Sequence, residues 1–353
     1  MPGLIVRSET PFNAETPLHL LRDVFTTSQR DFYVRSHGSV PNLNEETYHL
    51  AVRGRVDRPL DLSLDQLRSD FPRRAVMAVM QCAGNRRADL HEVRPVMGDP
   101  WSAGAIGNAL WGGVSLVDVL RAAGAETDAG LHVAFDACDS VAEGGRFGVS
   151  IPMTKAHCPD VVLAFAMNDE ALAPEHGFPL RVVVPGFAGV RSPKWLAAIT
   201  VQDAASDNAM QQTDYKMLPP KVTRDTVDWA EGITINEMPL NSAICVPADG
   251  ADVRSGPVPV RGYAMASGRG IERVDVSADG GRSWVQAALQ RQPEAPWSWT
   301  FWETEIVLPA GEHELAVRAW DSAGQTQPAA AEDVWNFKGY LCAVWHRVRV
   351  QAG

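Results

Sequence analysis

A cysteine and two adjacent arginines are the residues of this sequence whose types and spacing most directly allow chemistry. Cys82 lies in the segment MQCAGNRR, directly after the apolar run AVMAVM, and Arg86 and Arg87 follow four and five residues later. Nearby cations and the backbone N–H groups of a turn favour a thiolate over a thiol. Cys82 is therefore a candidate reactive or metal-binding sulfur. The alternative is a buried structural cysteine that ends a core strand, with the arginines facing solvent.

Three further segments combine aromatic, histidine and basic residues in a way that suits an anionic ligand. The planar fork of an arginine donates two parallel hydrogen bonds to a phosphate or a sulfate. In FYVRSHG, Arg35 and His37 share one side of an expected strand. Each such residue alone is more often a surface or core residue, but together they predict a basic pocket. HGFPLRVVVPG and GVRSPKW supply the rest of the set around glycine-bearing turns: His176, Arg181, Arg191 and Lys194.

Length and charge place this pocket in an acidic protein of about two domains. The chain has 353 residues and a formal net charge of −11. Cores rarely grow as one unit beyond roughly 250 to 300 residues. The acidic balance argues against nucleic acid as the main partner. No apolar run approaches the roughly 18 to 20 residues that span a bilayer, and the N-terminus shows no secretory pattern, so we expect no membrane association and a cytoplasmic location.

The elements that must position these residues change in type along the chain. The first 215 or so residues alternate period-two apolar runs with short helical patterns, one of them capped by Ser63. Pro219 and Pro220 then interrupt the chain in a polar segment. Beyond this break, short alternating runs recur every eight to twelve residues or so, which predicts an immunoglobulin-like β-sandwich. The expected fold class is α+β, with a mixed domain over residues 1–230 and a sandwich over residues 231–353.

Six motifs together resemble the sulfite oxidase family of molybdenum enzymes. They occur in the family's order: QCAGNRR, AIGNALWGG, HGFPLRVVVPG, the SPKW turn, QQTDYK and WHRV. The resemblance runs from FYVRSHG to WHRVRV and is closest to the haem-free, plant-type members, because no cytochrome b5-like segment precedes FYVRSHG. It implies a molybdopterin-binding domain, a β-rich dimerisation domain and a homodimer. It also implies a molybdenum–molybdopterin cofactor, without haem or flavin.

The resemblance further implies a role for individual residues. Cys82 would ligate molybdenum, since a deprotonated thiolate beside cations suits a high-valent metal. The pterin and its phosphate would be held by residues from four segments: Tyr33, Arg35, His37, Asp139, His176, Arg181, Ser192 and Lys194. The substrate would lie over the metal. Arg35 and four further side chains would surround it, and these four are Arg87, Trp101, Tyr215 and Arg347.

The implied activity is oxidation of sulfite to sulfate by oxygen-atom transfer, with electrons passed to oxygen or a soluble acceptor. Where sulfite oxidases usually carry Lys or Arg ten residues after the second arginine of AGNRR, this chain has Met97. A lost charge-assisted hydrogen bond is worth about 1.5 to 3 kcal/mol. A family member acting on nitrate or an S-oxide is therefore the alternative enzyme, although Tyr215 favours sulfite. Outside the enzymes, the alternative is a β-rich protein that grips an anion structurally.

Overall fold

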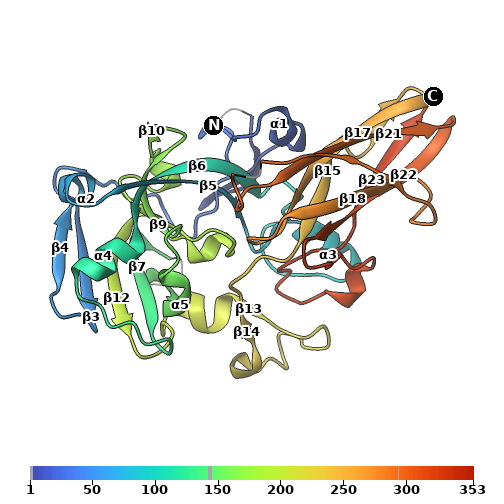
Figure 1. Ribbon diagram of the computed structural model, residues 1–353. Coiled ribbons are helices and arrows are strands. Elements are labelled where there is room, and N and C mark those ends of the chain that lie inside the picture. Colours follow the sequence, from blue (N-terminus) through green and yellow to red (C-terminus); the bar gives the residue numbers. More distant parts are fainter. Residues whose placement is uncertain (1–2, 142–144, 293) are drawn as a thin grey trace.

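The computed structural model describes residues 3–141, 145–292 and 294–353, which form two parts lying side by side (Figure 1). The N-terminal part carries β1 to β12 and the C-terminal part carries β15 to β23, with a small two-stranded sheet of β13 and β14 between them in the chain. The elements of the N-terminal part are β1 (Ile5–Glu9), β2 (Phe12–Glu15), α1 (Leu18–Asp23), β3 (His49–Gly54), β4 (Leu60–Ser63), α2 (Leu64–Ser69), β5 (Arg73–Gln81), α3 (Arg87–Val93), β6 (Ile106–Ser115), α4 (Leu116–Ala122), β7 (His132–Ser140), β8 (Arg146–Pro152), α5 (Met153–Ala156), β9 (Val162–Met167), β10 (Glu170–Ala171), η1 (Pro174–His176), β11 (Arg181–Val183), η2 (Gly189–Arg191) and β12 (Leu196–Gln202). The elements that follow are the π-helical turn η3 (Met210–Asp214), β13 (Lys216–Met217), η4 (Trp229–Glu231), β14 (Ile233–Thr234), β15 (Asn241–Val246), β16 (Ala251–Val253), β17 (Gly256–Met265), β18 (Ile271–Ser277), β19 (Val285–Gln286), β20 (Ala288–Gln290), β21 (Thr300–Leu308), β22 (Gly311–Asp321), η5 (Ala331–Asp333) and β23 (His346–Ala352).

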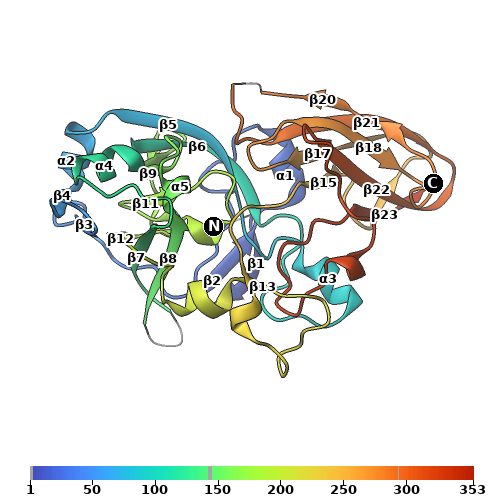
Figure 2. The same cartoon turned by 60° about the horizontal axis from the view of Figure 1, so that its bottom comes forward.

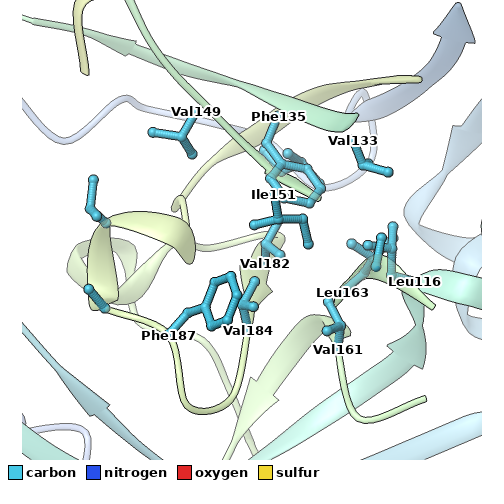
Figure 3. Packing of buried hydrophobic residues seen from close by; sticks show 14 of the residues in the cluster. Leu116, Val133, Phe135, Val149, Ile151, Val161, Leu163, Val182, Val184 and Phe187 are labelled. Atoms are coloured by element: carbon cyan, nitrogen blue, oxygen red, sulfur yellow. The ribbon is translucent and has the colours of Figure 1, made fainter. Parts of the chain in front are cut away.

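Two five-stranded sheets build the N-terminal part. One sheet has the order β10-β9-β6-β5, with β11 also paired to β9, and the other has the order β4-β3-β12-β7-β8. The pairing is antiparallel except between β3 and β12, which run parallel. Apolar side chains from both sheets and from α4 meet in one buried cluster, in which Leu116, Phe135 and Leu163 are representative (Figure 3). This core fixes the ends of the strands on which the site residues lie.

The C-terminal part is a sandwich of two sheets. Their orders are β15-β17-β21-β20 and β16-β23-β22-β18-β19. Alternate residues of β23, such as Val348 and Val350, are buried in a core shared with Val260 and Trp302 of the facing sheet. This alternation is typical of sandwiches with one face buried and one face solvated. The predicted α+β class, with a mixed domain followed by a β-rich one, is confirmed.

The helices are short and serve as connections between strands. The capping expectation for Ser63 is confirmed, because its hydroxyl accepts a hydrogen bond from the Gln66 N–H (3.2 Å) while the Gln66 side chain accepts one from the Ser63 N–H (2.9 Å). This capping box satisfies backbone donors that α2 would otherwise leave free. Within the described ranges, the helices lack the combined length and apolarity needed to cross a membrane.

A buried histidine gives the C-terminal part a dependence on pH. The Nδ1 atom of His346, at the start of β23, accepts a hydrogen bond from the Ile244 N–H (3.1 Å). Burial, reinforced by the charge of Arg86, lowers the pKa of His346 from its usual 6.5 to about 4. The folded protein therefore holds this histidine neutral at pH values where the unfolded chain protonates it.

We expect the stability that depends on neutral His346 to be complete above about pH 6.5 and to be lost as the pH falls towards about 4. One such group contributes a slope of up to about 1.4 kcal/mol per pH unit to the free energy of unfolding. Urea unfolding across this range measures the slope for the wild type and for His346→Asn, which cannot take up the proton. Equal slopes for the two proteins would contradict the assignment.

Candidate active site

Cys82 lies at the end of a core strand, immediately after β5. Its N–H donates to the Ala105 carbonyl (2.9 Å), and its Sγ accepts a hydrogen bond from the Gly84 N–H (3.4 Å). The first contact fixes the backbone at Cys82, and the second orients the sulfur atom. Cys82 is buried, yet its side chain lines a cavity. The structure therefore combines the core-strand position with the access that a ligating sulfur needs.

The cavity is formed by segments that are far apart in the chain. All residues predicted to bind the pterin line the cavity. The predicted metal ligand Cys82 lines it too, and so does Tyr215, which was predicted to face the substrate. The full set is Tyr33, Arg35, His37, Cys82, Asp139, His176, Arg181, Ser192, Lys194 and Tyr215. Arg191 lies beside it, fully buried, with its Nε donating to the Ile235 carbonyl (2.8 Å).

Three cations line this cavity without a carboxylate partner. Among the described residues, Arg35, Arg181 and Lys194 form no ion pair. Lys194 Nζ donates to the Ser36 hydroxyl and to a backbone carbonyl (both 2.8 Å), and burial followed by the charge of Arg181 lowers the pKa of Lys194 well below its usual value. Burial likewise lowers the pKa of Arg181 to about 10. Buried cations that repel each other are stabilised by a bound anion, so the cavity fits a ligand that carries a phosphate.

Burial keeps both histidines of the cavity neutral and shifts the pKa of its aspartate. Burial lowers the pKa of His176 to about 3, and its Nε2 donates to the Gln29 carbonyl (2.7 Å). Burial, with the charges of Arg35 and Lys194, lowers the pKa of His37 well below its usual value. Burial also raises the pKa of Asp139. Such a wall offers hydrogen bonds to a polar ring system without adding positive charge.

Tyr215 lies at the wall of the cavity in contact with a histidine and a second tyrosine. Its hydroxyl is 2.7 Å from His37 Nε2. Its ring stacks on that of Tyr340, with 5.2 Å between the ring centroids and 18° between the planes. Burial raises the pKa of Tyr215 to about 12, so the phenol keeps its proton near neutral pH. Tyr215 is therefore a hydrogen-bond donor held in a fixed orientation.

Arg87 directly follows residues 82–86, here called the cysteine loop, and close backbone contacts fix its side chain. Three glycines surround it, and a Cβ added at Gly84, Gly98 or Gly339 would lie 2.5, 2.8 or 2.6 Å from an atom of its side chain. Its Nε donates to the Gly339 carbonyl (3.3 Å). Arg87 is not among the residues that line the cavity, but its guanidinium lies 5.2 Å from the ring centroid of Tyr340. Its connection to the cavity therefore runs through Tyr340, which stacks on Tyr215.

Besides Arg87, two residues expected at the substrate position, Arg347 and Trp101, are not brought to the cavity wall. Arg347 lies on β23 between the buried His346 and Val348, so the strand alternation turns it to the opposite face, where it is 35% exposed and pairs with Glu314. Trp101 is fully buried in a cluster with Cys82, and its indole N–H has no hydrogen-bond partner among the described residues. The side chain of Met97 is 45% exposed and also lies outside the cavity lining.

Sequence reasoning missed two residues of the segment NFKGYL. Lys338 Nζ lies 3.2 Å from Asp214 Oδ1, next to Tyr215 in the chain, and Tyr340 stacks on Tyr215 itself. The available signal was a cation and an aromatic on either side of Gly339. This signal was too weak to decide their position.

Arg86 ties the cysteine loop to the C-terminal part. Its guanidinium is completely buried and donates to Asp89 (2.7 and 2.9 Å), to the Asn241 side chain (3.2 Å) and to the carbonyls of Val344 (2.6 Å) and Trp345 (3.1 Å). Burial opposes the charge, but Asp89 and other neighbours raise the pKa of Arg86 above its usual value. In the same region α3 packs against η5 (Figure 2). The loop that carries the thiol is thus fixed from both parts of the protein.

We expect Arg86→Met to lower the free energy of unfolding by about 3 to 5 kcal/mol, because it leaves buried acceptors from two segments without a donor. Arg121→Met is the matched control. Arg121 also pairs with an aspartate three residues away, but its side chain is 73% exposed, so its loss should cost at most about 1 kcal/mol. Urea unfolding of both variants measures the difference, and equal losses would contradict the role assigned to Arg86.

Comparison with known proteins gives two consecutive domain matches. Residues 37–210 match the family described as oxidoreductase molybdopterin binding domain, and residues 233–353 match the Mo-co oxidoreductase dimerisation domain. Sulfite oxidase of Gallus gallus is 45% identical, over 98% of this chain and 77% of that protein. Sulfite oxidase of Arabidopsis thaliana is 41% identical, over 100% of this chain and 95% of that protein. The chain spans 66% of the length of the mammalian mitochondrial relatives that it matches.

A solved structure supports the same assignment. The sulfane dehydrogenase SoxCD from Paracoccus pantotrophus superposes with a TM-score of 0.84 at 29% identity, over 98% of this chain and 85% of that chain. The similarity therefore includes the arrangement of the two parts as well as each part alone. With its cysteine-bearing cavity and its two matched domains, the chain belongs to the sulfite oxidase family of molybdenum-cofactor oxidoreductases.

Proposed function

We propose that this enzyme oxidises sulfite to sulfate by oxygen-atom transfer and passes two electrons to oxygen or to an external acceptor. The observation that carries the proposal is the cavity in which the Cys82 sulfur, the Tyr215 hydroxyl and the unpaired Arg35 face one space. Two of the relatives that match nearly the whole chain, from Gallus gallus and Arabidopsis thaliana, are named sulfite oxidases. A small dianion of sulfur fits a site that offers a fixed donor and a cation without a counter-ion.

The residues around the cavity fit the cofactor of the family. When bound, molybdenum–molybdopterin supplies the two-electron redox chemistry. The Cys82 thiolate would ligate the metal, and Asp139 would accept hydrogen bonds from pterin N–H groups. The remaining lining residues would hold the phosphate and the pterin edges through charge-assisted or neutral hydrogen bonds: Tyr33, Arg35, His37, His176, Arg181, Ser192 and Lys194.

The residues of the chain would bind and orient the substrate. Arg35 attracts sulfite and fixes its oxygen atoms, and the charge of Arg87 raises the positive potential behind the site. The hydroxyl of Tyr215 donates a hydrogen bond, and its contact with His37 holds that hydroxyl in one direction. Overall, sulfite gains one oxygen atom from water while two protons and two electrons leave. Trp101 supports the wall from behind, and we assign no part in the reaction to Arg347.

We also propose that the domain boundary lies near residue 230 and that residues 231–353 join two copies of the chain in a homodimer. The match of residues 233–353 to a dimerisation domain supports this assembly. The polyproline break at Pro219 and Pro220 supports the boundary, because few regular elements lie between β13 and β15.

The direct test is sulfite-dependent reduction of ferricyanide by protein with a full molybdenum content. We expect sulfite to be the preferred substrate over nitrate and over sulfane sulfur compounds. The second candidate activity, on a sulfane sulfur compound, is suggested by the similarity to the sulfane dehydrogenase SoxCD. Fully loaded protein that acts on a sulfane or on nitrate but not on sulfite would refute the proposal.

Cys82→Ser is expected to abolish sulfite oxidation and to remove the thiolate-to-metal charge-transfer absorption. Pterin content should stay close to that of the wild type, because the other cavity contacts come from separate segments. The matched control is Cys158→Ser, a half-buried thiol outside the cavity lining, which should keep activity and spectrum. Retained turnover in Cys82→Ser would remove this sulfur from the mechanism.

A further inference from the structure

Tyr340 brings the C-terminal part into contact with two residues of the site. Its ring is stacked on the ring of Tyr215, with centroids 5.2 Å apart and planes within 18° of parallel. The Arg87 guanidinium carbon lies 5.2 Å from the same ring centroid. One buried aromatic side chain therefore contacts both the phenol donor of the cavity and the arginine behind the cysteine loop. Neither contact is available from the N-terminal part alone.

The backbone around Tyr340 is fixed on both sides. The Tyr340 N–H donates to Asn336 Oδ1 (3.0 Å), and the Tyr340 carbonyl accepts from Asn336 Nδ2 (2.9 Å). The N–H of Leu341 donates to the carbonyl of Ala83 (2.8 Å), the residue after Cys82. The ring is thus held in register with the cysteine loop.

Two positive φ angles flank the ring. Gly339 has φ +64° and Leu341 has φ +55°. A bulky residue such as leucine rarely adopts this conformation, and such strain persists only where the surroundings over-determine it. Between them, the chain presents the Tyr340 ring to Tyr215 and Arg87. The local geometry therefore serves the placement of this side chain.

The hydroxyl of Tyr340 does not explain why a tyrosine ring is held here. It has no hydrogen-bond partner among the described residues. Burial, followed by the nearby Tyr215, raises the pKa of Tyr340, so the side chain stays neutral. Buried tyrosines usually place their hydroxyl against a partner, as Tyr263 does with the Ala103 carbonyl (2.9 Å). The contacts of Tyr340 that the structure shows are those of its ring.

We propose that Tyr340 is a positioning residue of the site that binds the sulfur oxyanion, here called the oxyanion site. The ring of Tyr340 fixes the plane of the Tyr215 ring and the position of the Arg87 guanidinium. The inference rests on the proposed function, because it concerns how that same site holds its sulfur oxyanion. Aromatic stacking and a cation–π contact both depend on the ring and not on the hydroxyl. The C-terminal part then contributes directly to substrate affinity in addition to any role in assembly.

The test compares Tyr340→Leu with Tyr340→Phe in oxidised, molybdenum-loaded enzyme. The dissociation constant of inorganic sulfate is measured by calorimetry, and KM and kcat for sulfite are measured in parallel. We expect Tyr340→Leu to raise the sulfate dissociation constant and the sulfite KM about tenfold, with a smaller change in kcat, because both ring contacts are lost. Tyr340→Phe keeps the ring and should stay within about twofold of the wild type.

Trp229→Leu is the matched control. Trp229 contacts Phe337 and Lys338 of the NFKGYL segment, but neither Tyr215 nor Arg87. Its loss should therefore loosen that segment without removing the contacts of the Tyr340 ring. It should bind sulfate like the wild type. If Tyr340→Leu does not fold, Tyr340→Met removes the ring with an unbranched, more adaptable side chain and takes its place.

Three results would overturn the inference. These are unchanged sulfate affinity in the folded leucine variant, equal weakening in the phenylalanine variant, and equal weakening in the Trp229 control. The sulfate measurement also separates this inference from the proposed function. Wild-type enzyme that binds sulfate but does not oxidise sulfite would refute the function, while the comparison of the Tyr340 variants would still decide the positioning role.

Discussion

The buried guanidinium of Arg86 is the contact on which the arrangement of the site depends. A fully buried cation is costly unless each of its donors finds an acceptor. Here the acceptors come from Asp89 nearby and from Asn241, Val344 and Trp345 in the C-terminal part. These acceptors fix the cysteine loop against the segment that leads into β23. Arg87, the next residue, donates to the carbonyls of Lys338 and Gly339 as well as to that of Asp99, so two consecutive side chains join the parts.

The cavity shows how an acidic protein can hold anions. The chain carries a net charge of −11, yet the three cations of the cavity have no acidic partner among the described residues. Their donors are directed to carbonyls and hydroxyls, which orient the side chains without neutralising them. A neutral His176 and a neutral His37 complete the wall. Charge is concentrated where a ligand binds, while the rest of the surface remains acidic and repels anions elsewhere.

Much of the fold and of the cofactor site could be predicted because the information is local. Apolar alternation and turn residues predict the strands, and contiguous motifs carry Cys82, Arg35, His176 and Lys194 into one cavity. Arg347 was misplaced because the WHRV motif gives the residue type but not the face of β23 on which each side chain lies. The partners of Arg86 and Tyr340 could not be read from the sequence, because the contacts join segments more than a hundred residues apart. Such pairs depend on how two cores pack together.

The position of NFKGYL near the end of the chain has a consequence for biosynthesis. A ribosome makes Cys82 and most of the cavity wall long before it makes Tyr340 and the carbonyls that receive Arg86. A nascent chain can therefore bury its first core while its cysteine loop still lacks the final supports. These supports of the cysteine loop and of Tyr215 exist only after residues 338 to 345 have been made, so a chain interrupted before them lacks these contacts.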